Sequence, residues 1–144
     1  MERIAVVATL GVTEAERESI ERFESEVINP SMSALVILDF WADWCGPCKR
    51  FGPVFEAASQ EHPDIVFGKV DTEAEQALAR AANITSIPML MGFRDGILVF
   101  AQAGALPAPM LSEVIDKVKG LDMDAVRAEV EAQKTQPAAA DGAR

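Results

Sequence analysis

Both cysteines of this 144-residue chain stand in one short run, Trp44-Cys45-Gly46-Pro47-Cys48-Lys49. Two thiols separated by two residues close a small disulfide ring with little loss of chain entropy, so the pair can be oxidised and reduced without remodelling the fold. Because the sequence holds no other cysteine, it has no structural disulfide framework. The run therefore predicts a redox-active pair at one point of the fold.

The residues around the pair predict its place between a strand and a helix. Residues 35 to 40 are apolar and β-branched, which is typical of a buried strand, and apolar residues recur at helical spacing after Cys48. Cys45 then lies at the helix N-terminus, where unpaired N–H groups and the helix dipole favour a thiolate. Cys48 lies one turn further along the same face. We therefore predict that Cys45 is the nucleophile and that Cys48 resolves a mixed disulfide.

The two residues between the cysteines suit an exposed site. Pro47 fits the first helical turn, where its missing N–H costs nothing, and Gly46 lets another chain approach the sulfur atoms closely. We expect both residues to line the surface that a client protein contacts.

The rest of the chain predicts alternating helices and strands. The expected helices cover residues 13–28, 46–61, 73–82 and 109–119, and the expected strands cover 4–8, 35–40, 65–70, 89–93 and 97–102. Asn29-Pro30-Ser31 is expected to end the first helix. A helical crossover between the second and third strands predicts a parallel pair, and Asp95-Gly96 predicts an antiparallel hairpin. The result is a mixed central sheet covered by helices.

Composition and charge indicate which partners the chain can bind and in which compartment it works. The net charge of −10 and a pI near 4.5 oppose binding to nucleic acid or to anionic membranes, so protein clients are the expected partners. No apolar run is long enough to cross a bilayer, and the N-terminus lacks a convincing cleavage site. One cysteine pair without a framework suits a reducing compartment, which predicts a cytoplasmic protein.

The segment from Asp39 to Lys49 resembles the active-site segment of the thioredoxin family, with its Trp-Cys-Gly-Pro-Cys motif. Further matches follow in the family's order: Pro53, Lys69-Val70-Asp71, Ile84 to Pro88, Phe93 to Gly96, and Gly104 to Leu106. Several matches in order are specific, whereas a bare Cys-x-x-Cys would not be.

The resemblance implies an α/β protein with the thioredoxin fold, in which helices flank a central mixed β-sheet on both faces. We expect residues 1–120 to form this domain, although residues 1–18 match the family poorly. Residues 121–144 are then a C-terminal extension. Within it, residues 122–134 predict a short amphipathic helix, and the Pro- and Ala-containing tail after it is expected to be mobile.

The resemblance also implies a proton acceptor beneath the cysteines. Asp39 would take the proton of Cys48, and its place in an apolar strand predicts a raised pKa through desolvation. Lys69 matches a position from which its charge would bias that equilibrium, although a solvated edge residue is an equally good interpretation. Both are counted as candidate catalytic residues.

Four residues outside the helix start are implied to bind the client. Ile87 and Pro88, the latter with a cis peptide bond, would present backbone to an extended client segment, and Gly104 would flank the same groove. Trp44 would form part of the docking surface, whereas Trp41 would pack beneath the motif. Met89 departs from the family, which usually has threonine after the cis proline, and this change could alter the groove.

The implied activity is reduction of client disulfides by dithiol–disulfide exchange. The chain would bind no cofactor and no metal, and a thioredoxin reductase drawing on NADPH would restore its electrons. Three other functions stay open. A disulfide oxidase or isomerase would use the same chemistry, and an interaction module such as a cochaperone would survive loss of both cysteines. A metal site at Cys45 and Cys48 is the weakest alternative because two further ligands are lacking nearby.

Overall fold

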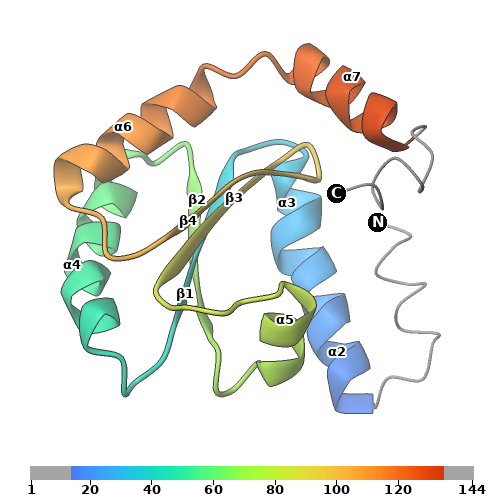
Figure 1. Ribbon diagram of the computed structural model, residues 1–144. Helices are drawn as coiled ribbons and strands as arrows, with labels where there is room; N and C mark the ends of the chain where they lie inside the picture. Colours follow the sequence, from blue (N-terminus) through green and yellow to red (C-terminus); the bar gives the residue numbers. More distant parts are fainter. Residues whose placement is uncertain (1–13, 135–144) are drawn as a thin grey trace, which may run out of the picture.

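The computed structural model describes residues 14–134 and shows a four-stranded sheet with helices on both faces (Figure 1). The strands are β1 (Val36–Trp41), β2 (Val66–Asp71), β3 (Met89–Arg94) and β4 (Ile97–Ala103). The helices are α2 (Glu14–Phe23), the π-helical segment η1 (Glu24–Ile28), α3 (Asn29–Ser31), α4 (Gly46–Glu61), α5 (Gln76–Ala81), α6 (Ala108–Lys119) and α7 (Met123–Lys134). The strand predicted for residues 4–8 and the tail predicted to be mobile lie outside the described residues.

The strand order is β2-β1-β3-β4. β1 pairs with β2 in parallel and with β3 antiparallel, which confirms the predicted mixed sheet. The parallel pair is joined through α4, because a parallel return needs a crossover long enough to hold a helix. Asp39 of β1 lies in register with Lys69 of β2 and with Leu90 of β3.

Successive side chains of β1 point alternately into two apolar cores, one on each face of the sheet. Ile37 packs with residues of α4 and α6, whereas Leu38 and Phe40 pack with residues of α2, η1 and α5. This alternation follows from the two-residue period of a strand, and it puts Asp39 on the same face as Ile37, toward α4. The sheet thus separates α4 and α6 from α2, α3 and α5 (Figure 1).

Helical structure runs past the predicted end at residue 28 and stops at Ser31, the last residue of the segment that was predicted to end it. Helical structure continues through η1 into α3, and the N–H of Asn29 bonds to the carbonyl of Glu24, five residues back. Pro30 then stands in the first turn of α3, where a helix does not need its missing N–H. The wider π turn lets the helix pass the proline.

α5 begins later than residue 73, where its start was predicted. The carboxylate of Asp71 accepts hydrogen bonds from the backbone N–H groups of Glu73 (2.9 Å) and Ala74 (3.4 Å), which closes a turn directly after β2. The chain therefore enters α5 only at Gln76.

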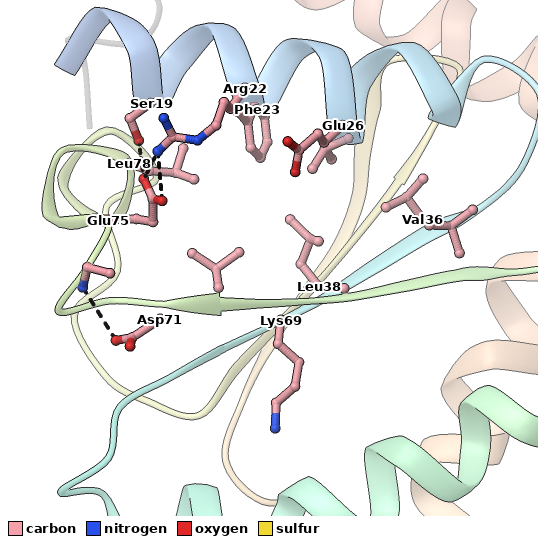
Figure 2. A pocket seen from close by; sticks show the side chains of 15 residues that line it. Ser19, Arg22, Phe23, Glu26, Val36, Leu38, Lys69, Asp71, Glu75 and Leu78 are labelled. Atoms are coloured by element: carbon pink, nitrogen blue, oxygen red, sulfur yellow. Dashed lines mark hydrogen bonds and ion pairs between the residues drawn. The ribbon is translucent and has the colours of Figure 1, made fainter. Parts of the chain in front are cut away.

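On the α2 face, a cavity of about 310 Å³ lies between α2, β2 and α5 (Figure 2). At its rim Glu75 accepts hydrogen bonds from the hydroxyl of Ser19 (2.6 Å) and from the guanidinium of Arg22 (2.7 Å to each carboxylate oxygen). These bonds, with that from Ser19 contributing most, lower the pKa of Glu75. Figure 2 also shows that Lys69 extends from β2 away from this cavity.

The helix predicted beyond residue 121 is present as α7. Two contacts hold α7 on the domain. Met123 at its start is buried, and Arg127 forms an ion pair with Asp95 of the β3–β4 turn at 2.6 Å. Within residues 14–134 no helix has the length and apolar character needed to span a membrane.

Candidate active site

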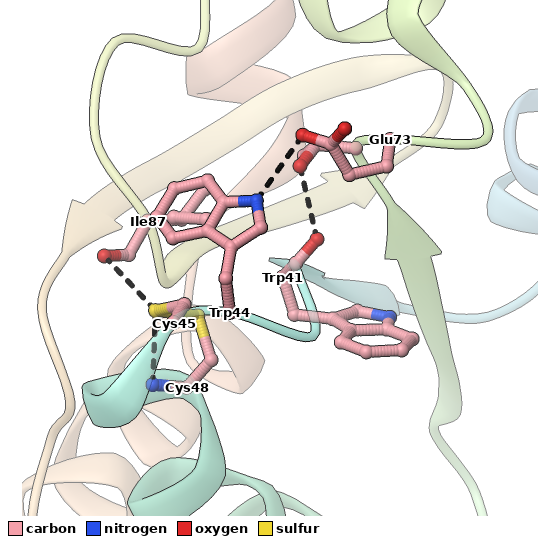
Figure 3. Close-up of a disulfide and its surroundings, with 7 residues drawn as sticks. Trp41, Trp44, Cys45, Cys48, Glu73 and Ile87 are labelled. Atoms are coloured by element: carbon pink, nitrogen blue, oxygen red, sulfur yellow. Dashed lines mark hydrogen bonds between the residues drawn. A yellow bond between two sulfur atoms is a disulfide. The ribbon is translucent and has the colours of Figure 1, made fainter.

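The cysteine pair lies where β1 gives way to α4 (Figure 3). Cys45 is the N-cap of this 16-residue helix, with an extended backbone at φ −89° and ψ 109°. Its Sγ accepts the backbone N–H of Cys48 at 3.2 Å. The two residues form a disulfide, and their Cα atoms are 5.3 Å apart. The predicted strand–cysteine–helix arrangement is therefore confirmed.

The cap hydrogen bond has a chemical consequence for the reduced pair. A helix start leaves several backbone N–H groups without helical acceptors, and here one of them points at the Cys45 sulfur. Negative charge on that sulfur gains both the hydrogen bond and the attraction of the helix dipole, so the arrangement favours the thiolate. Cys48 lies inside the first turn and is 5 % exposed.

A second segment reaches the cysteines from the loop before β3. The Ile87–Pro88 peptide bond is cis, as the resemblance implied. The carbonyl oxygen of Ile87 lies 3.8 Å from the Cys45 Sγ (Figure 3). Pro88 is buried, and its carbonyl accepts the N–H of Gly104 at 2.9 Å.

Gly104 closes this edge of the site in a conformation that favours glycine. Its φ is +103°, and nothing lies within 4 Å of the position that a side chain would take. The residue is exposed, so its backbone is open to another chain. Gly46 and Pro47 are also exposed, on the helix side of the cysteines.

Trp44 lies on the outer side of the pair and is 69 % exposed. Its indole N–H donates to the carboxylate of Glu73 at 3.2 Å, which ties the motif to the turn after β2 (Figure 3). Thr72 strengthens the same link, because both its backbone N–H (2.9 Å) and its hydroxyl (3.0 Å) donate to the carbonyl of Trp41. Neither Glu73 nor Thr72 was predicted as a site residue, although Asp71 beside them is a residue type that favours a turn at this position.

Asp39 is fully buried in β1, with an exposed fraction of 0 %. Neither carboxylate oxygen has a hydrogen-bond partner among the described residues. Desolvation raises the pKa of Asp39 to about 6, and the positive charge of Lys69 opposes that rise. The carboxylate is therefore ionised for the most part at pH 7 but close to the range in which it takes up a proton.

A cavity of about 320 Å³ opens between the motif, α4 and β2. Cys48, Trp41 and Lys69 are among the residues that line it. The Lys69 ammonium lies 5.1 Å from the centre of the Trp41 ring. Cys48 and Lys69 thus face one small space, and Lys69 is in register with the buried Asp39.

The predicted site residues gather at one edge of the sheet, drawn from β1, the start of α4, β2 and the loops around Pro88 and Gly104. Trp41 is half-buried and packs against the cluster of Ala42, Cys45 and Cys48, as expected. The roles proposed for the individual residues stay predictions.

Comparisons with known proteins agree with this geometry. The family model described as Thioredoxin matches residues 14–117. Putative thioredoxin 2 of Streptomyces coelicolor is 53 % identical over 116 residues, which cover 81 % of this chain and 84 % of that relative. Thioredoxin 1 of Synechococcus elongatus is 42 % identical over 96 residues, or 66 % of this chain and 88 % of that relative.

A solved structure is similar as well. The X-ray structure of Fasciola hepatica thioredoxin has a TM-score of 0.61 and 33 % sequence identity, and the match covers 65 % of this chain and 88 % of that one. The chain therefore belongs to the thioredoxin family and has its fold. With its cysteine pair at disulfide distance, it is a thiol–disulfide oxidoreductase of the protein-disulfide reductase class. α7 lies beyond the residues that the family model matches.

Proposed function

We propose that Cys45 attacks client disulfides and that Cys48 completes the exchange. The Cys45 thiolate attacks one client sulfur, forms a mixed disulfide and releases the other client sulfur as a thiolate. The Cys48 thiolate then attacks the Cys45 Sγ, which releases the second client thiolate and leaves the Cys45–Cys48 disulfide. Two electrons pass to the client, and its thiolates take up protons from the site and the solvent.

The single observation that supports this order of attack is the cap hydrogen bond. Only Cys45 occupies the N-cap, with the Cys48 N–H directed at its sulfur. Cys48 is also buried but lies inside the first turn of α4, so its sulfur lacks the N-cap position while desolvation disfavours its thiolate. Its thiol therefore needs a base when it attacks.

Asp39 is the base that we assign to this step. It is buried, it has no hydrogen-bond partner among the described residues, and its pKa of about 6 leaves most molecules ionised at pH 7. A carboxylate held in that state takes a proton readily when the mixed disulfide needs to be resolved. Lys69, in register with it, would keep the ionised form accessible.

An extended client segment would lie across the exposed surface around Cys45. Trp44, Gly46 and Pro47 would contact it on the helix side. Ile87, Pro88 and Gly104 would contact it on the other side, mainly through backbone groups. The open space at Gly104 supports close approach of another main chain.

We also assign the chain to the cytoplasm, with a thioredoxin reductase as its electron donor and NADPH as the ultimate source. Exchange at the Cys45–Cys48 pair carries electrons in and out by the same chemistry, so the chain itself would need no bound cofactor. Bacterial relatives that are named thioredoxins support this assignment.

Insulin-disulfide reduction tests the proposed order of attack. Cys45→Ser should reduce the rate at least about a thousandfold, because the serine hydroxyl is a far weaker nucleophile. Cys48→Ser should accumulate a mixed disulfide with the client at Cys45. The exposed Ser33→Ala is a matched control at the far end of the sheet and should keep the full rate. Wild-type activity in Cys45→Ser would overturn the proposal.

The redox potential against glutathione tests the direction of electron flow. A potential near that of reducing cytosolic dithiols, roughly −270 mV, agrees with a reductase. A strongly oxidising value, roughly −120 mV, would support the disulfide oxidase or isomerase instead.

A further inference from the structure

The lysine beside the buried carboxylate has an aromatic partner instead of an anionic one. Lys69 is exposed, and its Nζ lies 5.1 Å from the centre of the Trp41 ring, within the range of a cation–π contact. None of the ion pairs among residues 14–134 involves Lys69. Its ammonium is therefore held without being neutralised by a carboxylate.

The backbone directs this ammonium toward the active-site cavity. Lys69 and Asp39 are in register on adjacent strands, so their side chains leave the sheet on the same face. Gly52 of α4 leaves room at the other side of the cavity, since a side-chain carbon there would lie 3.7 Å from the Lys69 Nζ. The ammonium thus lies between the Trp41 ring and the backbone of α4.

Carboxylates that could neutralise Lys69 are close at hand. Asp43 and Glu56 line the same cavity, and Lys49 adds a second positive charge to it. Neither acid forms an ion pair with Lys69 in the described structure. A long, flexible lysine without a fixed partner would spend time near these acids or in solvent.

We propose that Trp41 is a positioning residue that holds the Lys69 ammonium on its ring face, so that an uncompensated positive charge stays beside Asp39 and Cys48. The indole attracts a cation through its quadrupole and carries no net charge that would cancel it. A carboxylate in the same place would hold Lys69 equally well but would remove its influence on Asp39. The proposal rests on the proposed role of Asp39 as proton acceptor.

The test is a double-mutant cycle that follows the Asp39 side-chain carboxyl by NMR as pH changes. The oxidised protein is used, because cysteines in a disulfide do not titrate and cannot couple to Asp39. In the wild-type background, Trp41→Leu should move the Asp39 midpoint upward by about half a pH unit, because a displaced positive charge stabilises the carboxylate less. Lys69→Met should move it upward by at least as much.

The decisive comparison is Trp41→Leu in the Lys69→Met background. If the tryptophan acts through the lysine, this second change leaves the midpoint where Lys69→Met alone puts it. An equal upward shift in both backgrounds would overturn the proposal, because Trp41 would then act on Asp39 independently of Lys69. A downward shift would overturn it too, because it would mean that Trp41 acts by shielding Asp39 from water. No shift in the wild-type background would overturn it as well.

Two further variants keep the result interpretable. Trp41→Phe retains an aromatic face and should give an Asp39 midpoint between those of wild type and Trp41→Leu. If Trp41→Leu fails to fold, Trp41→Phe is compared in the wild-type and Lys69→Met backgrounds in its place. Trp44→Leu, at the other tryptophan of the motif, should not move the Asp39 midpoint. A Phe variant shifted as far as Lys69→Met would contradict the assigned contact.

The titration is independent of the exchange reaction. If Cys45→Ser kept full insulin-reducing activity, the proposed function would fail while the Trp41–Lys69 coupling could still be measured. If the coupling were absent, the exchange mechanism would stand and only the positioning role would be lost. A kinetic readout then links the two: Trp41→Leu should move the pH midpoint of mixed-disulfide resolution in the same direction as the Asp39 midpoint.

Discussion

Asp39 and Glu75 are carboxylates on opposite faces of the same sheet, and the structure treats them in opposite ways. Glu75, on the α2 face, accepts hydrogen bonds from Ser19 and Arg22, and its pKa is lowered. Asp39, on the α4 face, is fully buried without a hydrogen-bond partner among the described residues, and its pKa is raised to about 6. The hydrogen bonds of Glu75 stabilise the fold. The burial of Asp39 lowers the free energy of unfolding at neutral pH but leaves a carboxyl group that can take up and release a proton near that pH.

Among changes to these two carboxylates and their partners, the largest effect is expected from Asp39→Asn. The variant should slow insulin reduction at pH 7 at least about tenfold, because the base for Cys48 is lost. It should also raise the free energy of unfolding at pH 7 by about 1 to 3 kcal/mol, since a buried and unpartnered charge is removed. Urea unfolding and the insulin assay measure the two quantities. Unchanged kinetics would remove Asp39 from the mechanism.

The second prediction concerns the pH dependence of stability. The pKa of Asp39 is higher in the folded than in the unfolded chain, so between about pH 4 and pH 6 the folded state binds more protons. Its contribution to the free energy of unfolding should fall by about 3 kcal/mol as pH rises through this window. The difference between wild type and Asp39→Asn, measured by urea unfolding at several pH values, isolates this contribution. A difference that does not vary with pH contradicts the raised pKa.

Glu75→Gln tests the other side of the comparison. It should lower the free energy of unfolding by about 1 to 2 kcal/mol, because a charge-assisted contact with Arg22 is lost while part of the hydrogen bonding remains. The insulin-reducing activity should stay at the wild-type level. The lowered pKa of Glu75 gives its contribution the opposite pH dependence: it is present above the ordinary glutamate range and is lost as pH falls. A stabilised Glu75→Gln variant would show that the two carboxylates do not differ as described.

The smallest effect is expected from Arg22→Lys. Arg22 is half-exposed, so solvent screens its interaction with Glu75, and a lysine can still contact one carboxylate oxygen. The free energy of unfolding should fall by less than in Glu75→Gln, and 1 M salt should reduce the difference from wild type. A loss as large as that of Glu75→Gln would mean that the pair is far less screened than its exposure indicates.

Local sequence patterns predicted most of the fold. The β-branched run before the cysteines, the helical spacing after them and the Asp95-Gly96 turn each encode their structure within a few residues. These signals and the family resemblance were enough to predict the mixed sheet, the cysteine pair at the start of α4 and the burial of Asp39.

Features that depend on contacts between distant segments could not be predicted in the same way. The helix passes Pro30 because the turns before it widen, which no pattern in this sequence signals. Gly92 in β3 is covered by the Phe100 ring of β4, and a side-chain carbon at Gly92 would clash with that ring. The sequence shows a glycine in a strand but not the aromatic residue that covers it.

The contacts of the site show the same limit. The hydrogen bond between Trp44 and Glu73 joins residues 29 positions apart, and the contact between Lys69 and Trp41 depends on strand register. Sequence spacing alone carries no information on either. The resemblance predicted the place of Lys69 in the site but not what holds its ammonium.

The rate of alkylation at Cys45 as a function of pH tests the central claim most directly, which is that the start of α4 favours a thiolate at this sulfur. The reduced protein is treated with iodoacetamide, and modification of Cys45 and Cys48 is followed separately by mass spectrometry. The account predicts a midpoint for Cys45 clearly below about 8.5, the ordinary value for a free cysteine, and a rate at pH 7 several times that of a peptide thiol. A Cys45 that reacts no faster than the peptide thiol, with a midpoint at or above that value, would contradict it.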